Sequence, residues 1–262
     1  MGSEESGGFK APPQSVSFDG LLFDMDGTLI DSTDAVVKHW HTVGEDIGVD
    51  PKVILQTSHG RRSIDILKIL APDKANWDYV RNMEAILPQK YGPDAVEIPG
   101  ARALLNKLIT RNAPWAIVTS GTEPLVEGWL KALNLPMPPR HLLITAESVT
   151  EGKPHPGCYI LGRERLGLSA PKDQGDCAKG GATRASEPRV LVLEDSPAGI
   201  RAGKAAGCFV LGLVTSHTLE QVLSAEPDWV VQDLRSVSVV EDKSGEKAVT
   251  VEIRDAFVTE KK

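Results

Sequence analysis

The sequence predicts an α/β protein in which a doubly wound parallel sheet carries a small inserted helical module. Short, continuously apolar runs recur along the chain, and most are followed by segments whose apolar residues repeat at helical spacing. Continuous apolar strands are typical of parallel sheets that helices bury on both faces. The stretch from residue 34 to residue 97 interrupts this alternation, because it has helical patterns and no convincing buried strand.

The expected strands are all short, and each ends in polar or glycine-rich residues. They are LLF before Asp24, WAIV before Thr119, LLI at 142–144, VLVL before Glu194 and CFVLGLV at 208–214. Ser32 is a plausible N-cap for the helix that follows the first strand. The small residues of AGIRAGKAAG would let the helix after VLVL pack closely on the sheet.

These patterns also indicate how the chain is divided. We expect a flexible tail over 1–15, an α/β core over 16–33 and 98–262, and a helical module over 34–97. The module would be joined to the core by two linkers and would lie over the carboxyl ends of the strands. Within the core, the Gly- and Ala-rich segment 170–188 predicts a mobile surface loop. Alternating residues around a Ser-Gly turn predict a β-hairpin over 236–254.

Composition argues against several classes of protein. The chain has 262 residues and a formal net charge of −7, whereas a nucleic-acid groove is basic. No apolar run approaches the ~20 residues of a membrane helix, and the first residues lack the features of a signal peptide. The cysteines at 158, 177 and 208 indicate reduced thiols in a cytoplasmic protein. Gly2 and Ser6 fit a loose myristoylation pattern, for which a flexible polar tail is the commoner explanation.

Paired acids follow two of the expected strands. Asp24 and Asp26 are separated by one residue, and Glu194 and Asp195 are adjacent. Ligands of open α/β sheets bind outside the carboxyl ends of the strands, so these four acids are expected to converge, and Gly27 lets the chain turn away. Converging carboxylates repel one another unless a cation lies between them, and oxygen ligands favour Mg²⁺. The four acids therefore predict a magnesium site.

The same residue types can carry phosphoryl chemistry. A carboxylate can attack phosphorus and form an aspartyl-phosphate, which splits a difficult hydrolysis into two displacements. Cations must then surround the phosphoryl oxygens, and an acid must protonate the leaving alcohol. Lys153 in EGKPHP is a candidate cation, and Ser120 and Gly121 precede a helix, where phosphate oxygens bind readily. Each motif alone could be an ordinary turn, but together they occur in one consistent α/β pattern.

These segments resemble the haloacid dehalogenase superfamily of aspartate-based phosphatases. DMDGTLIDS, VTSG, GKPHP and LEDSPAGIRAGKAAG resemble its four motifs in order. The resemblance implies a Rossmann-like core with a small helical cap that closes over the substrate. It implies that Asp24 is the nucleophile, that Asp26 is the general acid and then the general base, and that Ser120 and Lys153 bind phosphate. Mg²⁺ would be held by Asp24, the backbone carbonyl of Asp26, and Asp195, with Glu194 close by.

The expected cap carries a closer resemblance. TSHGRRSIDILKILAPD, LPQKYG and EIPGA are similar to the fungal glycerol-phosphate and 2-deoxyglucose-6-phosphate phosphatases. The resemblance implies that His59, Gly60 and Arg62 contact the substrate, with Arg61 as a further candidate. The alternative is that the two arginines only solvate the start of a helix. The chain departs from this subfamily in the long loop over 170–188 and in Arg61, where an aromatic residue is expected.

We therefore expect a Mg²⁺-dependent phosphatase that hydrolyses a small phosphorylated polyol or sugar, of the glycerol phosphate or 2-deoxyglucose 6-phosphate type. Its partner would be a small-molecule phosphomonoester, with no nucleic acid and no membrane, and the protein would be a monomer. The alternative is a phosphosugar mutase of the β-phosphoglucomutase type. Mutases of this kind typically have a bulkier apolar residue where this chain has Thr28, so the resemblance at this position favours the hydrolases. A non-enzymatic phosphometabolite-binding protein is a third reading, which the intact Asp24, Asp26, Lys153 and Asp195 disfavour.

Overall fold

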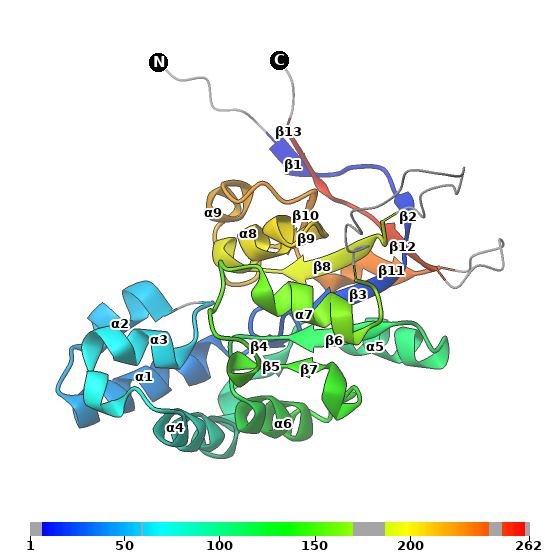
Figure 1. Ribbon diagram of the computed structural model, residues 1–262. Coiled ribbons are helices and arrows are strands. Elements are labelled where there is room, and N and C mark those ends of the chain that lie inside the picture. The colour runs from blue at the N-terminus through cyan, green and yellow to red at the C-terminus, as the bar shows by residue number, and fades with distance from the viewer. Residues whose placement is uncertain (1–6, 59, 170–186, 241–247, 260–262) are drawn as a thin grey trace, which may run out of the picture.

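A six-stranded sheet forms the centre of the protein. The computed structural model describes residues 7–58, 60–169, 187–240 and 248–259. All six strands are parallel, in the order β10-β9-β8-β3-β6-β7 (Figure 1). Their bounds are β3 Gly20–Phe23, β6 Trp115–Val118, β7 Leu143–Ile144, β8 Val190–Glu194, β9 Phe209–Leu213 and β10 Trp229–Val231. The α/β fold class predicted from the apolar runs is confirmed.

Helices cover both faces of this sheet. Successive strand residues point to opposite faces, so Leu21 and Phe23 of β3 belong to one apolar cluster and Leu22 to another. The sheet-covering helices of the first cluster include α5 (Ala101–Thr110) and α6 (Glu123–Ala132), and those of the second include α7 (Gly157–Arg165), α8 (Pro197–Ala205) and α9 (Leu219–Leu223). Burial on both faces explains why the strands are continuously apolar rather than alternating.

A helical segment is inserted between β3 and β6, where the sequence predicts the helical module. Its helices are α1 (Thr33–Ile47), α2 (Pro51–Ser58), α3 (Ser63–Leu70) and α4 (Trp77–Lys90). They share an apolar cluster of their own that includes Trp40, Leu67 and Val80. The segments that enter and leave it pair antiparallel as β4 (Ile30–Asp31) and β5 (Val96–Glu97). In Figure 1 the arrowheads of β6 and β8 point toward this segment, which therefore lies beyond the carboxyl ends of the sheet.

A second sheet packs beside α5, in the order β11-β12-β2. β11 (Val237–Val239) and β12 (Val249–Ile253) are antiparallel where a hairpin is expected, and residues 241–247 of its connection lie outside the described residues. β12 also pairs antiparallel with β2 (Gln14–Phe18). The buried valines of β11 and β12 extend the first apolar cluster of the core.

The N-terminal segment differs from the expected flexible tail over 1–15. β1 (Gly7–Phe9) pairs antiparallel with β13 (Phe257–Thr259), and β2 begins at Gln14. The partners of both strands lie near the C-terminus, so no local pattern could indicate the pairing. Residues 1–6, including Gly2 and Ser6, lie outside the described residues, as do residues 170–186 of the expected loop over 170–188.

Short 3₁₀ helices complete the architecture. They are Pro72–Lys74, Gly92–Asp94, Arg140–Leu142, Ala146–Ser148 and Leu234–Ser236. Of the helices in the described ranges, none combines the length and the apolar character that a membrane crossing requires.

Candidate active site

Three buried carboxylates converge at the carboxyl ends of two neighbouring strands. Asp24 follows β3, and Glu194 and Asp195 stand at the end of β8, which pairs with β3. Each of the three offers one carboxylate oxygen, and these oxygens lie within 4.8 Å of one another. Burial raises the pKa of Asp24 well above its ordinary value, and the charges of Glu194 and Asp195 add to this rise against the opposing charge of Lys153. The cluster therefore favours a bound cation.

Lys153 supplies one positive charge to this cluster. Its Nζ donates to Asp24 Oδ1 at 2.5 Å and to Glu194 Oε1 at 2.7 Å, and it also contacts the carbonyl oxygen of Val118 at 3.2 Å. Burial disfavours the ammonium, but the two carboxylates outweigh it and hold the pKa of Lys153 above its usual range. Three carboxylates and one ammonium leave a formal charge of −2. These side chains therefore fit a divalent ion such as Mg²⁺, which prefers oxygen ligands.

Glu194 is held by groups of the protein itself. Besides Lys153, its carboxylate accepts hydrogen bonds from the Tyr159 hydroxyl at 3.0 Å and from the backbone N–H and hydroxyl of Ser196 at 2.9 and 3.1 Å. It is fully buried. A Cβ at Gly199 would lie only 1.5 Å from Glu194 Oε1, so glycine is required there. This explains why the helix after VLVL begins with small residues.

Asp195 is fixed between two loops. It accepts hydrogen bonds from Thr28 Oγ1 at 3.3 Å and from Ser216 Oγ, and His217 Nδ1 lies 3.6 Å away. Gly27 passes beside it with a φ of +81°, and a Cβ there would lie 2.2 Å from Asp195 Oδ2. Gly27 therefore serves both the turn after Asp26 and the close approach of Asp195.

Asp26 stands apart from the three clustered carboxylates. It nevertheless lines, with Asp24 and Asp195, one pocket between the core and the helical segment. Its Oδ1 accepts a hydrogen bond from Ser32 Oγ at 2.6 Å. Burial raises the pKa of Asp26 to about 6, despite the opposing Ser32 hydrogen bond. Such a carboxyl group can give and take a proton near neutral pH. Ser32, which the sequence suggests as a helix cap, makes no side-chain cap bond and instead contacts Asp26.

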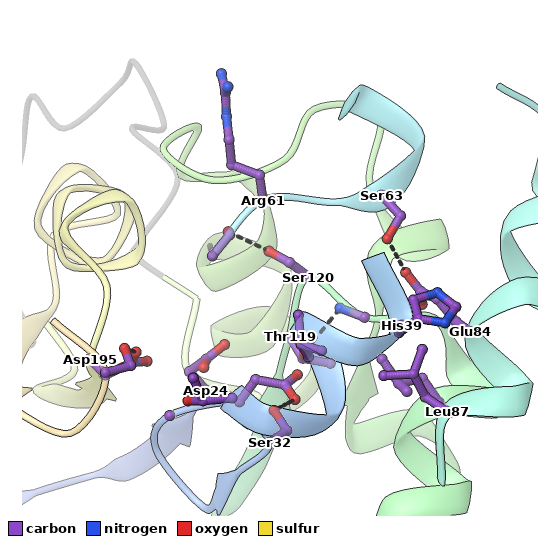
Figure 2. Close-up of a pocket in the computed structure, with 18 of the residues that line it drawn as sticks. Asp24, Ser32, His39, Arg61, Ser63, Glu84, Leu87, Thr119, Ser120 and Asp195 are labelled. Carbon is purple, nitrogen blue, oxygen red and sulfur yellow. Dashed lines mark hydrogen bonds between the residues drawn. The ribbon is translucent and has the colours of Figure 1, made fainter. Parts of the chain in front are cut away.

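Ser120 and Gly121 follow β6 and line the pocket with the two aspartates. Ser120 Oγ donates to the carbonyl oxygen of Gly60 at 2.9 Å, a contact between the core and the helical segment that Figure 2 marks with a dashed line. The structure therefore brings together Asp24, Asp26, Ser120, Lys153, Glu194 and Asp195, as the sequence predicts.

The cap residues behave differently from one another. Gly60 and Arg61 line the pocket, whereas Arg62 does not. The Arg62 guanidinium is buried, and all five of its N–H groups have partners in the protein. They donate to both oxygens of Asp65 and to the carbonyl oxygens of Ala146, Val149 and Thr150. Arg62 therefore fixes the helical segment to the core, and its expected contact with the substrate is not supported. His59 lies outside the described residues.

His39 on α1 and Glu84 on α4 are among the polar residues of the pocket that sequence reasoning missed. Glu84 accepts hydrogen bonds from Ser63 Oγ at 2.5 Å and from the backbone N–H of Thr122 at 2.7 Å. Burial raises its pKa to about 7. The available signal was a charged residue on an apolar helical face, since Glu84 is one turn from the buried Val80 and Leu87.

The pocket between the core and the helical segment has a volume of about 110 Å³. A single water needs about 10–15 Å³ by this measure, so the pocket holds a compact molecule in this arrangement. Its acidic end is formed by Asp24, Asp26 and Asp195, and Figure 2 shows His39 and Glu84 on the side away from Asp195.

Comparisons with known proteins show the family of the chain. The family model for haloacid dehalogenase-like hydrolases matches residues 18–207. A glycerol-1-phosphate phosphohydrolase of Saccharomyces cerevisiae is 38% identical over 252 residues, covering 95% of this chain and 94% of that protein. A 2-deoxyglucose-6-phosphate phosphatase of the same yeast is 32% identical, covering 91% and 96%. The hexitol phosphatase A of Escherichia coli is 33% identical, covering 87% and 96%.

Solved structures support the fold. A haloacid dehalogenase hydrolase from Entamoeba histolytica has a TM-score of 0.64 at 20% identity, covering 84% of this chain and 95% of that one. CbbY from Rhodobacter sphaeroides, solved in complex with phosphate, has a TM-score of 0.63 at 21% identity, covering 83% and 95%. The resemblance drawn from the four motifs and the cap is confirmed.

Proposed function

Because the chain belongs to the haloacid dehalogenase-like hydrolases, we propose that it is a Mg²⁺-dependent phosphatase of small phosphorylated polyols or sugars. Glycerol phosphate and 2-deoxyglucose 6-phosphate are the leading candidates, since these compounds appear in the names of the yeast relatives. We further propose that it acts as a cytoplasmic monomer, on a small-molecule phosphomonoester and on neither nucleic acid nor membrane.

The observation that carries this proposal is the cluster of Asp24, Lys153, Glu194 and Asp195. Asp24 and Asp195, with the backbone carbonyl of Asp26, would hold Mg²⁺, and Glu194 would hold Lys153 in place. When bound, the ion would reduce the repulsion between the phosphate and the acidic cluster. Lys153 lies 2.5 Å from Asp24, so its ammonium would stabilise a phosphate that reaches the same carboxylate.

The chain's own residues then account for both steps of hydrolysis. An Asp24 oxygen attacks phosphorus and forms the aspartyl-phosphate, while Asp26 gives its proton to the leaving alcohol oxygen. Asp26, now a carboxylate, removes a proton from the water that attacks the aspartyl-phosphate, which releases phosphate and restores Asp24. The raised pKa of Asp26, about 6, suits a group that must carry the proton in one step and accept it in the next.

The helical segment would act as the cap. Its contacts through Gly60 and Arg62 close the pocket over the acidic cluster, which limits access of bulk water during the reaction. A pocket of about 110 Å³ has room for several water molecules, and therefore for a small polyol or sugar. Arg61 lines the pocket, but its exposed side chain extends away from Ser120 and Asp24 in Figure 2, so neither arginine of the cap is assigned a substrate contact in this arrangement.

The test is phosphate release from glycerol phosphates, 2-deoxyglucose 6-phosphate and other hexose phosphates, with and without Mg²⁺. We expect Mg²⁺-dependent release that Asp24→Asn abolishes, because the amide is a poor nucleophile. Asp73→Asn, in an exposed 3₁₀ helix, is the matched control and should retain activity. Full activity of Asp24→Asn would eliminate the mechanism, and isomer formation without phosphate release would identify a mutase instead.

A further inference from the structure

His39 carries a buried polar atom that nothing in the protein satisfies. In the described part of the chain, three buried side-chain polar atoms lack a hydrogen-bond partner: His39 Nε2, Thr122 Oγ1 and Trp129 Nε1. Among these three residues, only His39 lines the pocket. Its side chain projects from α1, on the same helical face as the buried Ala35 and Val43.

An unsatisfied buried nitrogen is costly, so its presence calls for a reason. Leaving such a group without a partner costs about 1–3 kcal/mol, and the great majority of buried polar groups are hydrogen-bonded. Phenylalanine could occupy this position on an apolar helical face without the cost. Packing alone therefore gives no reason for a histidine.

The electrostatic state of His39 indicates what kind of group it would bind. Burial and, to a lesser extent, the positive charge of Lys90 together lower its pKa to about 4. The imidazole is therefore neutral near pH 7, and it offers one weak hydrogen-bonding nitrogen rather than a cation. A neutral imidazole suits a hydroxyl group, whereas a phosphate dianion would favour a charged side chain such as Lys153.

The surroundings of His39 match the alcohol part of a substrate. Leu87 and Trp40 line the same pocket and offer apolar contact to carbon, and Glu84 offers further oxygen atoms. Figure 2 shows His39, Glu84 and Leu87 grouped on one side of the pocket, with Asp195 on the other. A phosphate bound at Asp24 would direct its alcohol toward one of the remaining walls of the pocket.

We propose that His39 Nε2 hydrogen-bonds a hydroxyl group of the alcohol part of the substrate, so that His39 determines specificity for hydroxyl-rich phosphomonoesters. This inference rests on the proposed phosphatase function and adds to it the residue that distinguishes a polyol from an alcohol with no hydroxyl beyond the esterified one. A site built to bond a substrate hydroxyl discriminates against analogues that lack it, because its own polar group is then left unpaired.

The test compares two substrates in each variant. kcat/KM is measured for the polyol or sugar phosphate that the wild type hydrolyses fastest and for phenyl phosphate, whose alcohol has no further hydroxyl. In His39→Phe we expect kcat/KM for the first substrate to fall about tenfold, and that for phenyl phosphate to change by less than about twofold. His39→Gln, which keeps a hydrogen-bonding group, should restore part of the preference. His41→Phe, at an exposed position of the same helix, is the matched control and should behave as the wild type.

Each result has a defined meaning. Thermal unfolding of His39→Phe should show equal or greater stability, since an unsatisfied polar atom is removed; if this variant does not fold, His39→Gln and His39→Asn are compared in the same way. An equal loss for both substrates, or no loss for either, overturns the inference while leaving the phosphatase intact. If the wild type releases phosphate from no ester at all, the proposed function fails first.

Discussion

Replacing Lys153 by methionine should destabilise the protein strongly, quite apart from its effect on activity. Methionine keeps the length and the apolar stem of the side chain but removes the ammonium. Two contacts are lost, to Asp24 at 2.5 Å and to Glu194 at 2.7 Å, and the side chains of all three residues are at most 9% exposed. Breaking a buried ion pair by removing one partner costs about 3–5 kcal/mol, because an uncompensated charge stays buried. Since a whole protein is stable by about 5–15 kcal/mol, this loss is a large fraction of the total.

The free energy of unfolding is measured by urea denaturation at pH 7.5 in EDTA, so that no bound metal contributes. With a slope of about 2–3 kcal/mol per molar urea, a loss of about 4 kcal/mol moves the midpoint by more than about 1 M. Lys204→Met is the matched control. It removes a Lys–Asp contact of similar length, 2.8 Å to Asp228, but this lysine is 38% exposed, so the expected loss is at most about 1 kcal/mol.

The double variant Lys153→Met/Glu194→Gln separates charge from packing. If the buried charge causes the loss, neutralising Glu194 should recover part of it, and the two effects should be less than additive. A loss below about 1 kcal/mol in Lys153→Met, or strict additivity in the double variant, would refute the view that Lys153 compensates these carboxylates.

Three further predictions test other parts of the structure. Gly199→Ala should lower the free energy of unfolding by about 1–3 kcal/mol or more and reduce phosphatase activity, since its Cβ would lie 1.5 Å from Glu194. Gly92→Ala, where a Cβ meets nothing within 4 Å, is the control. Equal urea midpoints for the two variants would contradict the reasoning. Glu84 has a folded-state pKa of about 7, above its ordinary value of 4.5, so its stabilising contribution is complete below pH 4.5 and is lost as the pH rises through 7. The stability of Glu84→Gln relative to the wild type should therefore rise by roughly 3 kcal/mol between pH 4.5 and pH 8 in urea titrations, and a constant difference would be inconsistent with the raised pKa. Arg62→Lys cannot reproduce the planar set of five N–H donors, so limited proteolysis should cleave the β4 and β5 segments faster than in the wild type. Lys68→Arg, at an exposed position of α3, is the control and should leave the cleavage rate unchanged. Equal rates in all three proteins would show that Arg62 does not hold the cap.

The sheet and its acidic edge were predictable because their signals are local. Each strand is buried on both faces, so it is a continuous apolar run, and the residue after it is fixed at the carboxyl edge of the sheet. Asp24, Ser120 and Glu194 could be placed by this rule alone. Lys153 could be assigned because its motif occurs in the expected order, although nothing local shows that its ammonium reaches Asp24.

The added strands at the N-terminus were not predictable in the same way. β1 pairs with β13 and β2 pairs with β12, so each needs a partner that lies more than two hundred residues further along the chain. The sequence GGF has no alternation of its own, and three residues are too few to show a pattern. A strand whose stability comes from its partner leaves little signal in its own residues.

The cap shows a second limit of sequence reasoning, which concerns where a side chain points rather than which strands pair. Arg61 and Arg62 are adjacent and chemically identical, yet one lines the pocket and the other donates to Asp65 and to three carbonyl oxygens of the core. The difference arises from the packing of the cap loop against residues 146–150, which no spacing within the cap encodes. The positions of His39 and Glu84 were unpredictable for a similar reason. Each lies among apolar residues on one face of its helix, and the helix alone does not show that this face borders the pocket. Glu84 accepts hydrogen bonds from Ser63 within the helical segment and from the backbone N–H of Thr122 in the core, and His39 borders the pocket between the two parts. The proposed contacts with the substrate alcohol therefore depend on how the helical segment meets the core, which no pattern within one helix encodes.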